Sequence, residues 1–184
     1  MGFLGNLVAG KMIKKRLNRM FTAREIRLER DLKRHADFSH VKRKKILVAG
    51  SSGLIGRQLV AFLDTGGHDV WRLVRRVTKP GEKEIRWNPS EGEINPDELE
   101  GFDTIIHLGG AGIGDKRWSK KRMKLIEESR TVSTTLLSET LANLKNKPES
   151  FVVSSAVGWY GERGDEELTE DSTPGQGFLP LSLI

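Results

Sequence analysis

The sequence predicts an α/β fold in which a doubly wound, mostly parallel sheet lies between two layers of helices. From Lys45 onward, short apolar runs alternate with helical segments, and glycines directly follow two of these runs. Strands and helices that alternate at this spacing are typical of right-handed crossover units in a parallel sheet. We therefore expect a three-layer domain with strand order 3-2-1-4-5, preceded by a helical extension.

The strands are expected where apolar or β-branched residues cluster between turn signals. The run at residues 46–49 is apolar throughout, as in a strand buried on both faces. The polar stretch after Trp87, up to Gly101, is rich in proline, glycine and glutamate and is expected to form a loop. The five predicted strands are residues 46–49, 69–74, 84–87, 104–108 and 151–153.

Helices are predicted from the 3.6-residue period of the apolar side chains. Residues 54–63 form one such segment, which Gly66 and Gly67 end. Residues 119–144 form a longer one, with its apolar side chains expected on one side at Met123, Ile126, Val132, Leu136 and Leu137. Residues 3–35 are also helical in pattern, but Gly10 interrupts them, so two shorter helices or one kinked helix are both predicted.

Composition excludes several classes of protein. The 184 residues suffice for one domain of ordinary size plus an appendage. No run approaches the roughly 20 apolar residues that span a bilayer, and no secretory signal pattern is present. Cysteine is absent, which rules out disulfides, thiolate metal ligands and a cysteine nucleophile, and no metal site is expected. These features fit a reducing compartment, and we expect the protein in the cytoplasm.

Charge divides the chain into two segments. Residues 1–45 hold 14 Lys/Arg against 4 Asp/Glu, whereas the remainder holds 17 against 21. We therefore predict a basic helical extension at residues 1–44 and an α/β domain at residues 45–184. The extension could pack on another domain or chain, bind nucleic acid or lie on a membrane surface. No base-reading motif accompanies the basic residues, and aromatic residues are few, so packing is the favoured interpretation.

A glycine-rich turn joins the first predicted strand to the first predicted helix. Glycines at 50, 53 and 56 suit a tight turn, the close approach of a diphosphate and close helix–strand packing. The free amides at the helix N-terminus would bind the phosphates. This is the signature of a Rossmann-type dinucleotide site, although a strand-to-helix turn without a ligand is the alternative. The predicted contacts are Gly50, Ser51, Ser52, Gly53, Leu54, Ile55 and Gly56.

The end of the second predicted strand indicates which dinucleotide binds. NAD sites usually place Asp or Glu there to bind the ribose hydroxyls, but this chain has Arg75 and Arg76. A guanidinium attracts a 2′-phosphate, which a carboxylate would repel. We therefore predict NADP(H) rather than NAD(H), with Arg75 as the main contact and Arg76 as a second one. A solvated charge at the strand end is the alternative for Arg75.

Several further motifs, in order along residues 45–180, resemble the epimerase-like branch of the extended and atypical short-chain dehydrogenase/reductases. They are Leu108-Gly109-Gly110, Asp115-Lys116-Arg117-Trp118, Ser129-Arg130 and Ser154-Ser155-Ala156-Val157-Gly158-Trp159-Tyr160-Gly161. Members of this branch are described as nucleoside-diphosphate-sugar epimerases of unassigned substrate. Some bacterial members are fused behind a START/polyketide-cyclase-like domain. Residues 1–40 resemble the end of that domain. Relatives also continue past Gly177-Phe178-Leu179 into a substrate lobe, so the resemblance implies a C-terminally incomplete domain, whose last strand would be an uncovered edge.

The resemblance also implies roles for single residues. Leu108 and Gly109 would line the cofactor, and Arg130 would reach its phosphate or ribose. A surface arginine paired with Glu127 or Glu128 is the alternative for Arg130. Arg117 and Trp118 would organise the loop above the site.

The usual catalytic pair of this superfamily, Tyr-x-x-x-Lys, is absent. Tyr160 is the only tyrosine, and Gly164 lies four residues after it. Ser155 matches the serine that polarises the substrate carbonyl or hydroxyl in relatives, or else it caps a strand end. Tyr160 could orient substrate or act as a stand-in acid. The resemblance thus implies NADP(H)-dependent redox chemistry on a small hydroxyl or carbonyl compound, for instance a nucleotide sugar. The alternative is a non-catalytic NADP(H)-binding or redox-sensing module.

Overall fold

The computed structural model describes residues 3–178 and divides the chain after Lys42 into two compact units. The first unit contains helix α1, Phe3–Asp37, which runs through Gly10 without a break. The predicted interruption at Gly10 is therefore wrong. One glycine in a helix interior costs only about 1 kcal/mol relative to alanine, which a helix of this length tolerates.

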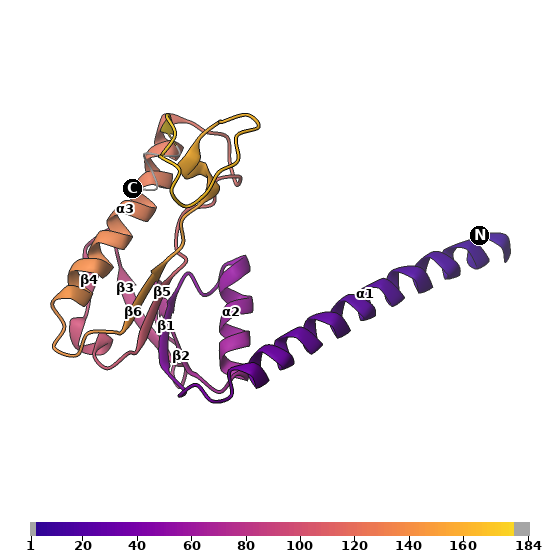
Figure 1. Ribbon diagram of the computed structural model, residues 1–184, viewed down its shortest axis with the longest axis horizontal. Coiled ribbons are helices and arrows are strands. Elements are labelled where there is room, and N and C mark those ends of the chain that lie inside the picture. The colour runs from indigo at the N-terminus through magenta and orange to yellow at the C-terminus, as the bar shows by residue number, and fades with distance from the viewer. Residues whose placement is uncertain (1–2, 179–184) are drawn as a thin grey trace. The chain divides into compact units, whose positions relative to one another are not determined.

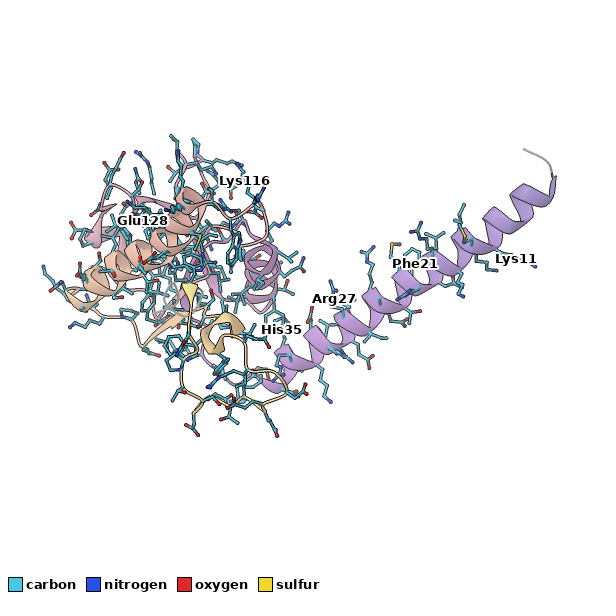
Figure 2. All side chains as sticks on the ribbon, turned by 90° about the horizontal axis from the view of Figure 1, so that it is seen from above. Lys11, Phe21, Arg27, His35, Lys116 and Glu128 are labelled. Carbon is cyan, nitrogen blue, oxygen red and sulfur yellow. The ribbon has the colours of Figure 1, made fainter. Side chains whose placement is uncertain are left out.

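Large apolar side chains of α1 are exposed alongside its basic ones. Figure 2 shows the side chains of Lys11, Phe21 and Arg27 standing out from this helix. No helix within residues 3–178 is long and apolar enough to cross a membrane. The exposed apolar side chains of this helix from Gly10 onward are Met12, Ile13, Leu17, Met20, Phe21, Ile26, Leu28 and Leu32.

The second unit is built on a six-stranded sheet with the order β4-β3-β2-β1-β5-β6. Five strands are parallel and confirm the predicted order and the Rossmann-type fold. Ala49 lies beside Leu73 on one side and His107 on the other, so the carboxyl ends of these strands meet at one edge. The strands are β1 Lys45–Ala49, β2 Asp69–Val74, β3 Glu84–Asn88, β4 Glu93–Ile94, β5 Thr104–His107 and β6 Ser150–Val153.

The stretch after Trp87 is more ordered than the sequence predicts. Strand β4 pairs antiparallel with β3, and a 3-10 helix, η1 (Pro96–Leu99), follows it. The predicted loop is therefore partly wrong, because a tight turn at Asn88 lets the chain fold back on β3. Leu99 is fully buried in the core, which anchors this segment despite its polar composition.

Two helices cover opposite faces of the sheet, as Figure 1 shows. Helix α2 (Leu54–Thr65) packs over β1 and β2, around Ile46, Val48, Val60 and Val70. Helix α3 (Lys120–Ala142) covers the larger cluster on the other face, which includes Leu47, Leu73, Ile105, Leu137 and Leu141. The α2 face is only partly covered at the edge strand β6, where Val152, which pairs with Ile106 on this face, is exposed.

The buried stripe of α3 differs from the predicted one. Val132 was expected on the packed side but is 43% exposed, whereas Ser133 is buried. A polar group is rarely buried without a partner. Ser133 has one in His107 on β5, so this polar residue can lie in the buried stripe between Ile126 and Leu137.

Candidate functional site

A cleft of about 1560 Å³ opens at the carboxyl ends of the parallel strands. It is lined by the β1–α2 turn, the ends of β2 and β3, the segment after β5 and one face of α3. Open α/β sheets bind their ligands at this edge, where the strand order reverses. In this sheet the reversal lies between β1 and β5.

Gly50 forms the tight turn at the end of β1. Its φ is +78°, a conformation that residues with a side chain rarely adopt. A Cβ atom at this position would lie 2.7 Å from the carbonyl carbon of Leu108. The amide of Gly53 closes the turn by donating to the Gly50 carbonyl oxygen at 3.0 Å. Only glycine therefore fits at residue 50.

The other two glycines differ in what surrounds them. A Cβ atom at Gly56 would lie 2.2 Å from the Gly50 oxygen, so this glycine lets α2 pack against the turn. At Gly53 the only neighbour of a Cβ atom within residues 3–178 would be the same oxygen, at 3.3 Å. Gly53 has ordinary extended backbone angles and lines the cleft. The space beside it is thus left open to a ligand.

The first turn of α2 provides unsatisfied donors. Gly53 is the N-cap residue, and no side chain caps the helix. The amides of Leu54, Ile55 and Gly56 have no acceptor within the helix. The side chains of Leu54 and Ile55 are 79% and 68% exposed. An uncapped helix N-terminus with a glycine cradle fits the diphosphate of a dinucleotide, which these amides and the turn at Ser51 and Ser52 would hold.

The two arginines after β2 have different surroundings. Arg76 forms a bidentate ion pair with Glu84, a carboxylate that is only 1% exposed. The amide of Lys79 donates to the same carboxylate at 3.0 Å. Arg75 is exposed, lines the cleft and has no hydrogen-bond or ion-pair partner among residues 3–178. Arg75 is the one available to an anion.

Glu84 and Arg76 hold each other in their charged forms. The hydrogen bond from Arg76 lowers the pKa of Glu84, and the amide of Lys79 lowers it further. The same bond raises the pKa of Arg76. The negative charge of Glu84, which also lines the cleft, is therefore neutralised within the fold.

A buried histidine ends β5. His107 is 1% exposed, and its Nε2 lies 2.8 Å from the Ser133 hydroxyl. Because that hydroxyl donates to the Ser129 carbonyl, it accepts from Nε2, while Nδ1 accepts from the Gly109 amide. Trp87 packs edge-on against the ring at 5.8 Å. Burial lowers the pKa of His107 and so favours the neutral ring, and the two hydrogen bonds favour its Nε2–H tautomer.

The segment after β5 is held by α3. The Ala111 amide donates to the Ser129 hydroxyl at 2.8 Å. Arg130 donates to the carbonyl oxygens of Ala111 and Ile126, at 3.2 and 2.9 Å. Burial lowers the pKa of its guanidinium. Leu108 and Gly109 line the cleft, whereas Arg130 does not.

The alternative pairing of Arg130 is not observed, since neither Glu127 nor Glu128 bonds to it within residues 3–178. Glu128 instead pairs with Lys124. In this structure Arg130, a residue of α3, therefore holds the segment after β5 in place, which the cofactor would contact.

The loop before α3 is tied by two side chains. Trp118 donates to the Ile113 carbonyl at 2.9 Å, in keeping with its expected role as an organiser of this loop. Arg122 donates to Gly112 and pairs with Asp115. Figure 2 shows Lys116 on this loop and Glu128 on α3. Arg122 could not be selected from the sequence, because a basic residue early in a helix carries no distinctive signal.

The two predicted catalytic residues lie outside the cleft. Ser155 is exposed, and Tyr160 is half-buried in the 3-10 helix η2 (Val157–Tyr160). Among residues 3–178, neither hydroxyl has a hydrogen-bond partner in the structure. The Gly175 amide donates to the Trp159 carbonyl at 2.9 Å, which joins η2 to the later loop.

Other polar residues at the cleft were missed by the sequence analysis. Glu84, His107 and Ser133 each have a partner far away along the chain or on another element. Their only signal in the sequence was a polar residue inside a predicted strand or helix. No group of three residues suited to hold a metal ion occurs within residues 3–178.

Fold and site together define a Rossmann-type α/β protein with a glycine-rich nucleotide turn. Residues 46–179 match the family described as "NAD dependent epimerase/dehydratase family", and the chain belongs to this family. The Epimerase family protein ML0860 of Mycobacterium leprae is 38% identical over 73% of this chain and 43% of its own length. The chain thus spans less than half the length of the curated relatives it matches.

Solved structures agree with this assignment. The nucleoside-diphosphate sugar epimerase from Corynebacterium glutamicum has a TM-score of 0.74 and 38% identity over 89% of this chain and 34% of its own. Human epimerase family protein SDR39U1, solved with NADPH, has a TM-score of 0.62 and 28% identity over 74% and 45%. MoeE5, in complex with UDP-glucose and NAD, has a TM-score of 0.61 and 27% identity over 75% and 45%.

Proposed function

We propose that this chain binds NADP(H) and forms part of an enzyme. The enzyme would carry out redox chemistry on a small hydroxyl or carbonyl compound, such as a nucleotide sugar. The observation that carries the proposal is the uncapped N-terminus of α2, which opens on the cleft beside the space left free at Gly53. Backbone amides at such a position bind phosphates.

The preference for NADP(H) rests on charge at the end of β2. Arg75 is free to bind a 2′-phosphate, and the nearby carboxylate of Glu84 is neutralised by Arg76. A structure of a human relative contains NADPH, which supports this choice. MoeE5 was solved with NAD, so the preference has to come from this chain's own arginines.

Each part of the site would have its own task. The nicotinamide ring supplies or accepts a hydride when the cofactor is bound. The amides of Leu54 and Ile55 would hold the diphosphate, and Leu108 and Gly109 would pack against the cofactor. Arg130 would orient that segment through Ala111 and is our candidate for a phosphate or ribose contact. Ser155 would polarise the substrate oxygen, and Tyr160 would orient substrate or donate a proton.

Titration with NADPH and NADH, followed by nicotinamide fluorescence, tests the cofactor preference. We expect wild type to bind NADPH at least about tenfold more tightly, and Arg75→Ala to lose most of this preference. Arg72→Ala is the matched control, since Arg72 lines the same cleft but pairs with Glu82. Equal affinities in wild type, or an unchanged preference in Arg75→Ala, would contradict the proposal.

A non-catalytic NADP(H)-binding or redox-sensing module is the second candidate. It is favoured by one observation: Ser155 and Tyr160 lie outside the cleft, and Gly164 rather than a lysine lies four residues after Tyr160. NADPH binding without turnover of sugars or simple carbonyls would support it. Turnover that is lost in Ser155→Ala would refute it.

For the first unit we propose a connecting role between this domain and an upstream START-like domain. The Corynebacterium structure covers 89% of this chain, which is a larger share than residues 43–184 alone make up. The match therefore includes part of α1. The exposed Leu17 and Phe21 would pack on that domain. In a chain carrying such a domain, amide exchange along α1 should be slower than in residues 1–184. Equal exchange rates would contradict this role.

A further inference from the structure

We propose that Arg57 of α2 acts together with Arg75 as a two-arginine site for a phosphate ester, the 2′-phosphate of the adenosine ribose. The inference rests on the proposed NADP(H) binding and adds a residue that the sequence analysis did not select. It follows from which basic side chains at the cleft are already ion-paired and which are not.

Five basic side chains line the cleft on the side of α2, β2 and β3, and three of them are already paired. Arg72 pairs with Glu82 at 3.4 Å, Lys83 with Asp69 at 2.6 Å, and Arg76 with Glu84. The remaining two, Arg57 and Arg75, have no ion-pair or hydrogen-bond partner for their side chains among residues 3–178. The five are Arg57, Arg72, Arg75, Arg76 and Lys83.

Arg57 is positioned by the helix that carries the glycine turn. Its amide donates to the Gly53 carbonyl oxygen at 3.1 Å, which fixes the first turn of α2. Arg57, Val60, Ala61 and Asp64 all line the cleft, as expected for residues three, four and seven apart on one helix face. This face of α2 therefore borders the cleft, and Arg57 is the member of it nearest to the diphosphate turn.

Arg75 approaches the same part of the cleft from the sheet. It directly follows β2, which pairs with β1, the strand that leads into the glycine turn. An anion placed between α2 and the end of β2 would meet Arg57 from one side and Arg75 from the other. Guanidinium groups form bidentate, charge-assisted bonds with phosphate oxygens, so two of them suit a dianionic phosphate ester.

The carboxylates nearby do not cancel this positive charge. Glu82 forms an ion pair with Arg72, and Glu84 forms one with Arg76. Asp64 lies two helical turns beyond Arg57, and the pKa of Lys83 is raised mainly by the hydrogen bond to Asp69 and less by the charge of Asp64. Arg76 is excluded from the site, because its guanidinium is already bound by the buried carboxylate of Glu84.

Calorimetric titration with 2′,5′-ADP and 5′-AMP separates the 2′-phosphate from the rest of the nucleotide. For Arg57→Gln we expect affinity for 2′,5′-ADP to fall about tenfold or more, while affinity for 5′-AMP stays within about twofold. Arg75→Gln should behave alike, and the double variant should bind both nucleotides about equally. Thermal unfolding checks that each variant is folded.

Two controls use the paired arginines of the same cleft. Arg72→Gln and the charge-neutral double replacement Arg76→Gln with Glu84→Gln should keep the preference for 2′,5′-ADP. A loss of preference in either control would move the phosphate site to that arginine and overturn the inference.

The remaining outcomes distinguish this inference from the proposed function. If wild type binds both nucleotides equally, the NADP(H) proposal and this inference both fail. If wild type prefers 2′,5′-ADP but Arg57→Gln retains the preference, only the role of Arg57 fails. If Arg57→Gln weakens both nucleotides equally, Arg57 binds the shared 5′-phosphate instead, and the inference is overturned.

Discussion

The glycine turn at the end of β1 and the stretch from Ser154 to Gly161 after β6 follow neighbouring parts of one sheet edge, yet they differ in how they are built. In the turn, Gly50 and Gly56 touch backbone so closely that a Cβ atom would lie within 2.8 Å of it. Ser155, in contrast, is exposed, and its hydroxyl has no partner within residues 3–178.

The difference shows that two kinds of functional group depend on different lengths of chain. A phosphate site made of backbone amides is complete within about one strand end and one helical turn. A site made of side chains needs groups from distant segments to orient each hydroxyl. The family match covers both stretches, but only the turn is already enclosed by its own contacts.

The largest expected effect is at Gly56. In Gly56→Val the new Cβ atom would lie 2.2 Å from the Gly50 oxygen, so α2 has to move away from the turn. We expect the free energy of unfolding in urea to fall by about 3 kcal/mol. Gly114→Val is the control, since no atom of the described residues 3–178 lies within 4 Å of a Cβ atom there. Equal losses in both variants would show that the turn is not closely packed.

Gly53→Val should separate binding from folding. A Cβ atom here would lie 3.3 Å from the Gly50 oxygen, a tight contact but far less severe than that at Gly56, so the loss of stability should be clearly smaller than in Gly56→Val. The added side chain would occupy the space proposed for the diphosphate. We expect NADPH affinity, measured by fluorescence, to fall about tenfold or more, which is about 1.4 kcal/mol. An unchanged affinity would remove the basis of the proposed site.

His107 lies between the two stretches, at the end of β5, and its burial predicts a pH-dependent stability. Burial lowers the pKa of the folded histidine below its ordinary value of 6.5. Below that value the unfolded chain binds a proton that the folded chain does not, so stability falls as the pH falls. The slope should reach at most about 1.4 kcal/mol per pH unit.

Urea unfolding between pH 7.5 and 5 measures this slope. In His107→Gln the part of the slope due to this histidine should disappear, although the variant is less stable at every pH. A variant with the same slope as wild type would show that His107 is not the group responsible.

Ser155→Ala should have the smallest effect. The hydroxyl has no partner to lose within residues 3–178, so stability should change by less than about 0.5 kcal/mol. NADPH affinity should stay within about twofold, because Ser155 does not line the cleft. A large loss of either quantity would mean that this stretch already belongs to the cofactor site.

The positions of the parallel strands and of the glycine turn could be predicted because both follow from short-range signals, and the strand order follows from the crossover topology that they indicate. Segments of three to six residues rich in apolar side chains mark the strands, and glycines at 50, 53 and 56 mark the turn. Arg75 could be selected in the same way, since its proposed role depends on its position directly after β2. Strand β4 could not, because its pairing with β3 depends on a turn in a polar segment.

The sequence by itself determined the sheet, the crossover helices and the uncapped helix end that faces the cleft, because the period of the apolar residues and the positions of glycine act locally. Only the tertiary structure decided which charged and polar groups are available. Arg75 and Arg76 are adjacent and chemically identical, yet a buried carboxylate eight residues from Arg76 engages that arginine alone. His107 and Ser133, likewise, meet across 26 residues of chain. Such pairings depend on how elements pack, which no local pattern specifies.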